Sequence, residues 1–132
     1  MTEHAGYIRP QFRTVTPYLT VRGAAGLIDF IARVFGGEEL RRDLRPDGTI
    51  LNAEMRVGDS LIELSEAGGS WQPRPGALHV YVPDTDAAYR RALDAGAASL
   101  YEPADMEYGE RSAGVEDPSG NYWYIATFQA GA

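Results

Sequence analysis

The stretch Gly58-Asp59-Ser60-Leu61-Ile62-Glu63-Leu64-Ser65-Glu66-Ala67 reads as a turn followed by one short strand. Strand alternation places Leu61, Glu63 and Ser65 on one face, so Glu63 is the single carboxylate on a face that is otherwise uncharged. Burying a carboxylate without a partner costs several kcal/mol, and such a strand therefore directs it to water, a cation, a hydrogen-bond partner or a ligand. The environment of Glu63 is thus the first functional question.

The segments before this strand have the patterns of one further strand, a helix and a meander. Residues 14–21 alternate between apolar and polar side chains, and Pro17 suits an edge strand. Apolar residues then recur at helical spacing from Leu27 to Phe35, before Gly36-Gly37. Turn sequences separate residues 38–45, 50–57 and 60–67. Residues 14–67 are therefore predicted to form a β-α-β-β-β module.

The second half of the chain repeats this order after the Gly/Pro-rich linker 68–76. A strand begins at residue 77, Asp84 suits a helix N-cap, and three more strand candidates follow, at 98–101, 110–116 and 121–128. A constant offset relates the halves, since Val21 corresponds to Val82 and Leu64 to Ile125 (82 minus 21 and 125 minus 64 are both 61). We therefore predict an α+β fold of two pseudo-symmetric modules with curved mixed sheets enclosing a cleft, with an arm at 1–13 and the second module at 77–128.

Composition narrows the classes of function. With 132 residues, 44% of them hydrophobic and no cysteine, the chain is expected to fold as one domain without disulfides or thiolate metal sites. The net charge of -7 argues against nucleic acid and anionic membranes as partners, and all 12 basic residues are arginine. The sequence contains no apolar run of membrane-spanning length and no signal-peptide pattern at its start, so a cytoplasmic location is expected.

Five strings, in this order and spacing, resemble the vicinal oxygen chelate superfamily, which includes glyoxalase I, bleomycin-resistance proteins and extradiol dioxygenases. They are VTPYLTV at 15–21, the helix end Phe35-Gly36, RVGDSLIELSE at 56–66, LHVYVPDTDAAY at 78–89 and DPSGNYWYIAT at 117–127. The resemblance is closest to the glyoxalase-like proteins of bacteria. It implies two modules around a ligand cleft, within a homodimer.

Metal-dependent members of this superfamily take four ligands from symmetry-related strands. The resemblance places those positions at Thr16, Glu63, Ala77 and Tyr124. Only Glu63 is an ordinary metal ligand, so we expect no metal cofactor; a Mg²⁺ or Mn²⁺ site made of Glu63, Glu54 and waters is the alternative. An Fe(II) facial triad needs two histidines, and the chain has only His4, in the arm, and His79.

Strand parity gives the side chains expected on the sheet faces opposite the helices. The predicted ligand-binding residues on these faces are Tyr18, Asn52, Glu54, Glu63, His79, Arg111, Tyr122 and Tyr124. The opposite parity includes Leu51, Ala53, Met55, Ile62, Leu64, Leu78, Trp123 and Ile125, which are expected to form the core.

Each of these residues also has a structural interpretation. Glu63 either contacts a ligand or pairs with Arg56 or Arg111, and His79 is either a hydrogen-bonded structural residue or the titratable group of the cleft. Arg111 either binds a carboxylate or phosphate or forms a salt bridge. Tyr122 and Tyr124 either stack on a flat ligand or pack within the protein.

Three hypotheses of function follow. The first is a metal-free small-molecule binding protein similar to bleomycin-resistance proteins. The second is a lyase or isomerase in which Glu63 is the base, with His79 or Tyr124 as the acid, or in which Glu63 is the sole protein carboxylate on a divalent metal. The third is an interaction module in which the dimer is the functional unit.

Overall fold

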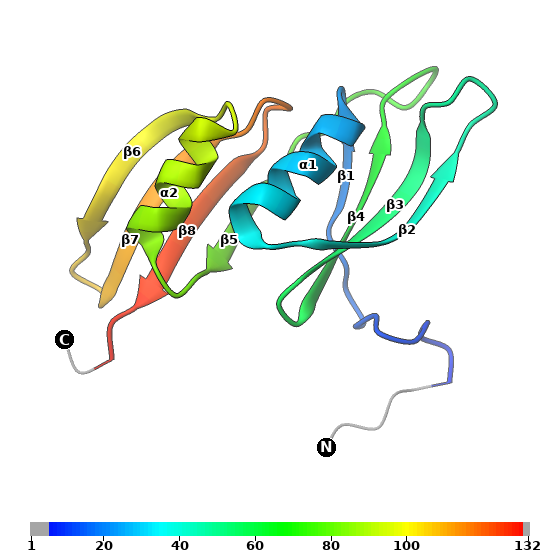
Figure 1. The fold of residues 1–132 in the computed structure, drawn as a ribbon. Coiled ribbons are helices and arrows are strands. Elements are labelled where there is room, and N and C mark those ends of the chain that lie inside the picture. The colour runs from blue at the N-terminus through cyan, green and yellow to red at the C-terminus, as the bar shows by residue number, and fades with distance from the viewer. Residues whose placement is uncertain (1–5, 131–132) are drawn as a thin grey trace.

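The computed structural model describes residues 6–130, which form two modules that lie side by side (Figure 1). The first module consists of β1 (Tyr18–Val21), α1 (Ala24–Phe35), β2 (Glu38–Leu44), β3 (Ile50–Val57) and β4 (Ser60–Glu66). The second consists of β5 (Ala77–Tyr81), α2 (Thr85–Asp94), β6 (Ala98–Asp105), β7 (Glu110–Glu116) and β8 (Tyr122–Phe128). The predicted α+β fold of two β-α-β-β-β modules is confirmed.

Each module contains one open, mixed sheet of four strands. The strand orders are β1-β4-β3-β2 and β5-β8-β7-β6, with β1 parallel to β4, β5 parallel to β8, and every other pair antiparallel. In the parallel pairs Tyr18 is opposite Glu63 and His79 is opposite Tyr124, which reproduces the offset of 61 on both strands (79 minus 18 and 124 minus 63).

The offset changes by one residue in the third strand of the meander. Glu54 is opposite Glu63, whereas Gly114 is opposite Tyr124, so β7 lies only 60 residues after β3 (114 minus 54). The turn between β7 and β8, residues 117–121, is longer than the Gly58-Asp59 turn and accounts for the difference. Because side chains alternate along a strand, a register error of one residue exchanges the two faces.

Both helices are capped at their N-terminal ends, the second by the residue that the sequence predicts and the first by a residue from a distant strand. Asp84 accepts a hydrogen bond from the amide of Ala87 at 3.1 Å and caps α2. Gly23 begins α1 with a φ of 82°, and the carboxylate of Glu66 accepts from the amides of Gly23 and Ala24 at 2.8–3.1 Å. The last residue of β4 therefore caps the helix of its own module and fixes its position over the sheet.

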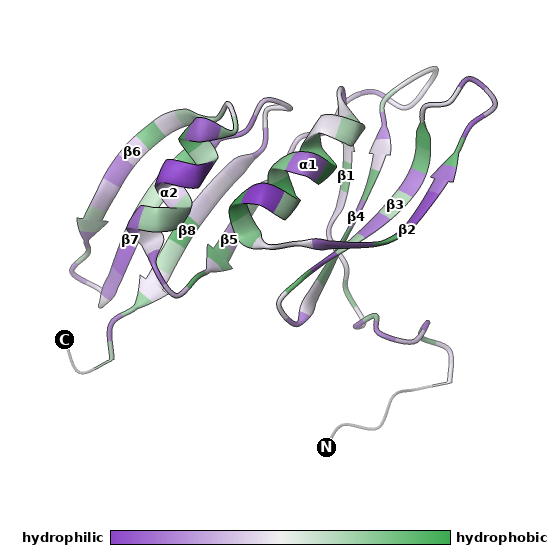
Figure 2. Cartoon of the chain, in the orientation of Figure 1, coloured by the Kyte–Doolittle hydropathy of each residue, from purple (hydrophilic) through white to green (hydrophobic). Residues whose placement is uncertain are grey.

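A single hydrophobic core joins the helix-facing sides of both modules. Apolar residues alternate with polar ones along both helices (Figure 2), and their buried sides share one cluster with β3, β4, β7 and β8. The indole ring of Trp123 lies 4.8 Å from the ring of Phe35 and 6.4 Å from that of Phe30, both on α1. Its Nε1 donates to the buried carboxylate of Asp117 at 2.7 Å, which holds the ring against the other module.

Three details of the sequence interpretation are corrected. The first strand begins at Tyr18 instead of residue 14, and Val15 before it is exposed, because Pro17 has no amide hydrogen for the ladder. The strand β6 continues through Pro103 to Asp105, which its edge position and irregular register tolerate. Leu51 is exposed and Ile50 enters the core instead, since the β2–β3 pairing has an irregularity where Leu44 pairs with Ile50.

Trp123→Ala should lower the free energy of unfolding by about 3–5 kcal/mol, because it removes the largest buried side chain and the contacts between modules. Urea denaturation measures this change. Trp71→Ala is the matched control, since Trp71 is 72% exposed, and should change the free energy by at most about 0.5 kcal/mol. Equal effects of the two substitutions would contradict the shared core.

Candidate functional site

The open face of each sheet is the face opposite its helix. The helix-facing sides of both sheets belong to one core, and the two open faces lie on the other sides of their sheets. The expected site residues therefore fall into two groups. Tyr18, Asn52, Glu54 and Glu63 lie on the open face of the first module, and His79, Tyr122 and Tyr124 lie on that of the second.

The carboxylates of the first open face lie on neighbouring strands. Glu63 is directly opposite Glu54 on β3 and Tyr18 on β1, and its Oε1 accepts a hydrogen bond from Asn52 Nδ2 at 3.2 Å. Of the two alternatives for Glu63, the pairing with Arg56 or Arg111 is not found, since Arg56 pairs with Glu38 at 2.7 Å and Arg111 faces the other side of its sheet. Glu63 is thus half-buried and held by an amide.

The N-terminal arm lies against this open face. Within its described part, Arg9 contacts Glu54 with a distance of 3.5 Å between the guanidinium nitrogen and Oε2, and Glu54 is only 7% exposed. Pro10, Gln11 and Phe12 line a small pocket together with Glu54 and Leu61. Residues 1–5 of the expected arm, including His4, lie outside the described residues. The arm therefore supplies a cation to the more deeply buried of the two carboxylates.

The second open face brings His79 together with a residue that sequence reasoning missed, Glu110. The Nε2 atom of His79 lies 3.5 Å from Oε1 of Glu110, and the hydroxyl of Tyr81 donates to Oε2 at 2.5 Å. The rings of His79 and Tyr81 meet edge to face with 4.7 Å between their centroids. Donation to Glu110 is the main cause of a raised pKa of Tyr81, with burial and nearby charge adding to it.

Arg111, predicted to lie on the open face, points instead toward α2. Its Nε donates to Asp86 Oδ1, its second nitrogen donates to Oδ2 at 3.0 Å, and a further bond reaches Asp105. The one-residue change of offset in β7 is the reason, because it exchanges the faces of Glu110 and Arg111. A comparison of the Gly58-Asp59 turn with the longer turn at 117–121 would have revealed this change of offset from the sequence. The hydrogen bonds from Arg111 lower the pKa of Asp86.

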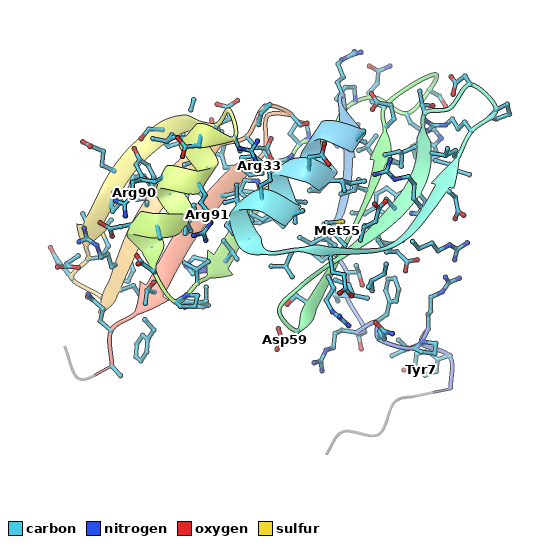
Figure 3. All side chains as sticks on the ribbon, in the orientation of Figure 1. Tyr7, Arg33, Met55, Asp59, Arg90 and Arg91 are labelled. Carbon is cyan, nitrogen blue, oxygen red and sulfur yellow. The ribbon has the colours of Figure 1, made fainter. Side chains whose placement is uncertain are left out.

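A groove of about 750 Å³ lies where the edges of the two modules meet. Its walls come from the segment before β1, the β3–β4 turn and the edge strand β5, with Phe35 and Trp123 behind them. Arg91, on the side of α2 that faces the first module (Figure 3), donates to the carbonyl of Val34 at 3.0 Å and also lines the groove. Of the predicted site residues only His79 reaches this groove.

The four positions that the resemblance gives for metal ligands do not form a donor set for a divalent metal. Thr16 lines the groove, whereas Glu63, Ala77 and Tyr124 do not, and Ala77 has no donor atom. Among residues 6–130 no three His, Asp or Glu side chains are grouped to hold a metal ion. The residues present therefore do not fit the metal centre of the superfamily.

The β-α-β-β-β modules and their open faces define a class of protein, and comparison with known proteins gives the family. Residues 11–125 match the model of the Glyoxalase/Bleomycin resistance protein/Dioxygenase superfamily, and the chain belongs to this superfamily. An uncharacterized protein from Mycobacterium bovis is 34% identical over 122 residues, which cover 84% of this chain and 80% of that protein.

Solved structures with the same fold include two proteins from other bacteria. TioX from Micromonospora sp. ML1 matches with a TM-score of 0.69 at 23% identity, covering 91% of this chain and 99% of TioX. The fosfomycin resistance protein FosX from Mesorhizobium loti matches with a TM-score of 0.66 at 14% identity, covering 89% and 93% of the two chains. At these identities the likeness shows the fold. Neither helix in the described part of the chain has the length and apolarity needed to cross a membrane.

Arg111→Gln should raise the pKa of Asp86 toward its ordinary value, because the bonds from the guanidinium that stabilise the carboxylate are lost. A folded-state pKa below the unfolded value contributes stability above the unfolded pKa, and this contribution is lost as the pH falls through the folded pKa. The variant should therefore be less stable than wild type at pH 7 and approach it in acid. NMR titration of the Asp86 carboxyl carbon and urea denaturation at both pH values measure this.

Arg41→Gln is the matched control, since Arg41 forms an exposed ion pair with Asp43 on β2. It should leave the pKa of Asp86 unchanged. An unchanged pKa of Asp86 in Arg111→Gln would show that Arg111 does not engage Asp86, and would restore Arg111 as a candidate for ligand binding.

Proposed function

We propose that the protein binds a small organic molecule in the groove between its modules. The observation that carries this proposal is the groove itself, whose volume of about 750 Å³ is in the range of small-molecule sites. Apolar side chains from both modules line it, among them Leu61 and Leu78, and Arg13, His79 and Arg91 contribute polar groups. Such a lining favours a ligand with an apolar body and a few polar substituents.

The proposed binding protein is of the bleomycin-resistance type and works without the metal centre of the superfamily. The chemistry of the four symmetry-related positions supports this, because Ala77 has no donor atom, Thr16 and Tyr124 offer only hydroxyl groups, and Glu63 is the one carboxylate among them. Binding then depends on shape, on aromatic contacts and on a few hydrogen bonds.

We propose further that the protein acts as a cytoplasmic homodimer. Its two open faces lie apart within one chain, and each presents aromatic or charged side chains to solvent, including Tyr18 at 48% and Tyr122 at 40% exposure. A second copy that faces one open face with another would cover these side chains and create a shared cleft. The arm before β1 and the exposed Trp71 are further contact candidates.

A thermal-shift screen of aromatic, carboxylated and amine-bearing compounds tests the binding function. A true ligand at about 100 times its Kd should raise the melting temperature by about 5 °C or more. Val15→Trp is the informative variant. Val15 lines the groove but is 82% exposed, so the larger side chain of tryptophan should reduce the volume of the groove without disturbing the core. It should weaken binding, whereas Leu44→Trp, exposed on β2 and absent from the groove lining, should not.

Absence of any stabilising compound in such a screen would count against a binding protein. Loss of affinity in Leu44→Trp equal to that in Val15→Trp would show that the ligand does not occupy the groove.

The second candidate function is a lyase or isomerase that uses Glu63 as the base or as the sole protein carboxylate on a divalent metal. It is favoured by the hydrogen bond from Asn52, which orients a half-buried carboxylate. Glu63→Gln keeps an acceptor for Asn52, so the fold should be retained. A binding protein that uses the groove should keep its affinity within about twofold in this variant, since Glu63 does not line the groove.

Loss of turnover of an identified substrate in Glu63→Gln, with affinity retained, would establish the enzyme instead. Elemental analysis of protein purified without chelator separates the metal-dependent version, which requires a stoichiometric divalent metal. We expect substoichiometric metal.

A further inference from the structure

The Glu110 cluster, made of His79, Tyr81, Tyr108, Glu110 and Phe128, lies at one end of the second open face. Phe128 is directly opposite Glu110 in the β7–β8 ladder, so their side chains are neighbours on the same face. Tyr81 bonds to Glu110, and Tyr108, in the turn before β7, lies close enough to Tyr81 to influence its pKa. Tyr81 and Phe128 thus neighbour one carboxylate, and Tyr108 lies near Tyr81.

The exposure of these rings contrasts with the burial of the carboxylate. Tyr81, Tyr108 and Phe128 are 62%, 67% and 64% exposed, whereas the side chain of Glu110 is 11% exposed. Large aromatic side chains gathered at the surface of a folded protein mark interaction sites more often than single exposed residues do. Here three exposed aromatic side chains accompany a carboxylate that is itself nearly buried.

The charge of Glu110 has no fixed cationic partner among the described residues. The Tyr81 hydroxyl is neutral, and His79 at 3.5 Å carries charge only when protonated. The arginines of the second module are directed elsewhere, since Arg90 and Arg91 lie on α2 and Arg111 bonds to Asp86 on the helix-facing side. A nearly buried carboxylate with neutral partners is an electrostatically favourable place for an added cation.

The first module contains a comparable buried carboxylate that does have a cationic partner. Glu54, at 7% exposure on the first open face, is contacted by the guanidinium of Arg9 from the chain's own arm. No corresponding arm covers Glu110 within residues 6–130, and the net charge of -7 favours the approach of cations over anions.

We propose that the Glu110 cluster binds the substituted ammonium group of a small organic ligand. The three exposed rings contact the cation through their faces, and the Glu110 carboxylate balances its charge. His79 and Tyr81 also line the groove between the modules, so the apolar body of the same ligand lies in the groove while its ammonium group lies at Glu110. The inference rests on the proposed binding function and names the class of ligand.

Choline and 3,3-dimethyl-1-butanol form the matched pair of probes, since the second replaces the quaternary nitrogen of the first by carbon. NMR titration of the full chain should show saturable shifts at Tyr81 and Phe128, with a Kd for choline at least about tenfold below that for the alcohol. Similar affinities for the two probes would overturn the proposal, because the carboxylate would then contribute nothing.

Two isosteric substitutions test the carboxylate itself. Glu110→Gln retains an acceptor for the Tyr81 hydroxyl but removes the charge, and should weaken choline binding at least about tenfold. Asp94→Asn makes the same change of charge on exposed Asp94 of α2, on the other side of the sheet, and should leave the Kd for choline unchanged. Equal effects of Glu110→Gln and Asp94→Asn on the Kd for choline would show that only the net charge of the protein matters, and would overturn the proposal.

The competing occupant is a second copy of the chain that packs on the Glu110 cluster itself, instead of leaving the cluster open to the shared cleft of the proposed homodimer. Sedimentation velocity of Phe128→Ser distinguishes the two, because an interface between copies would dissociate in this variant while a ligand site would leave the oligomeric state unchanged. Dissociation without any choline binding by the wild type would overturn the proposal.

Measuring the affinity of groove ligands for wild type and Glu110→Gln also distinguishes the cation site from the proposed binding function on which it rests. Compounds that bind in the groove with equal affinity to wild type and Glu110→Gln would leave the binding function standing and refute the cation site alone.

Discussion

The contact of Trp123 with Phe30 and Phe35 determines how the two modules are arranged. The indole ring extends from β8 of the second module onto α1 of the first, and Asp117 fixes its orientation by accepting the Nε1 hydrogen. Because this contact joins the helix-facing sides, both open faces are left outside the shared core. The groove between the modules and the two separate groups of polar side chains all follow from this one packing arrangement.

Much of the fold could be predicted because the two halves repeat their spacing. The offset of 61 residues correctly relates Val21 to Val82 and Leu64 to Ile125 as equivalent positions of the two modules. The parallel strand pairs β1–β4 and β5–β8 keep this offset. The offset fails in β7, where the turn beginning at Asp117 contains an additional residue. Asp117 accepts hydrogen bonds from the backbone amides of Ser119 and Asn121, and these bonds stabilise the conformation of this turn. Periodicity identifies the strands well, but it does not predict the register of a strand pair when the connecting turn differs in length between the two modules.

The candidate site was predictable only within a strand. Parity correctly places Asn52, Glu54 and Glu63 on one face, since they share two adjacent strands, and it places His79 on the other open face. The partners of these residues come from segments with no periodic pattern. Arg9 lies in the arm, and the groove is formed where the segment before β1 meets β5. Such contacts depend on tertiary packing, which local sequence patterns do not encode.

The pseudo-symmetric positions show where the two modules have diverged chemically. Core positions keep their apolar character, as at Ile62 and Trp123, because both sides of the shared core must exclude water. Open-face positions do not: Tyr18 corresponds to His79, and Glu63 corresponds to Tyr124. A substitution on an open face leaves the core intact, so each face is free to acquire its own chemistry.

One face has a buried carboxylate, Glu54, that the arm supplies with a cation, and the other has a buried carboxylate, Glu110, beside the exposed aromatic side chains of Tyr81 and Phe128. The backbone of the two modules is therefore similar while the side chains on their open faces differ in charge and aromatic character. The groove adjoins the first open face through Leu61 and the second through His79 and Tyr81, so a ligand there is expected to meet different side chains from the two modules.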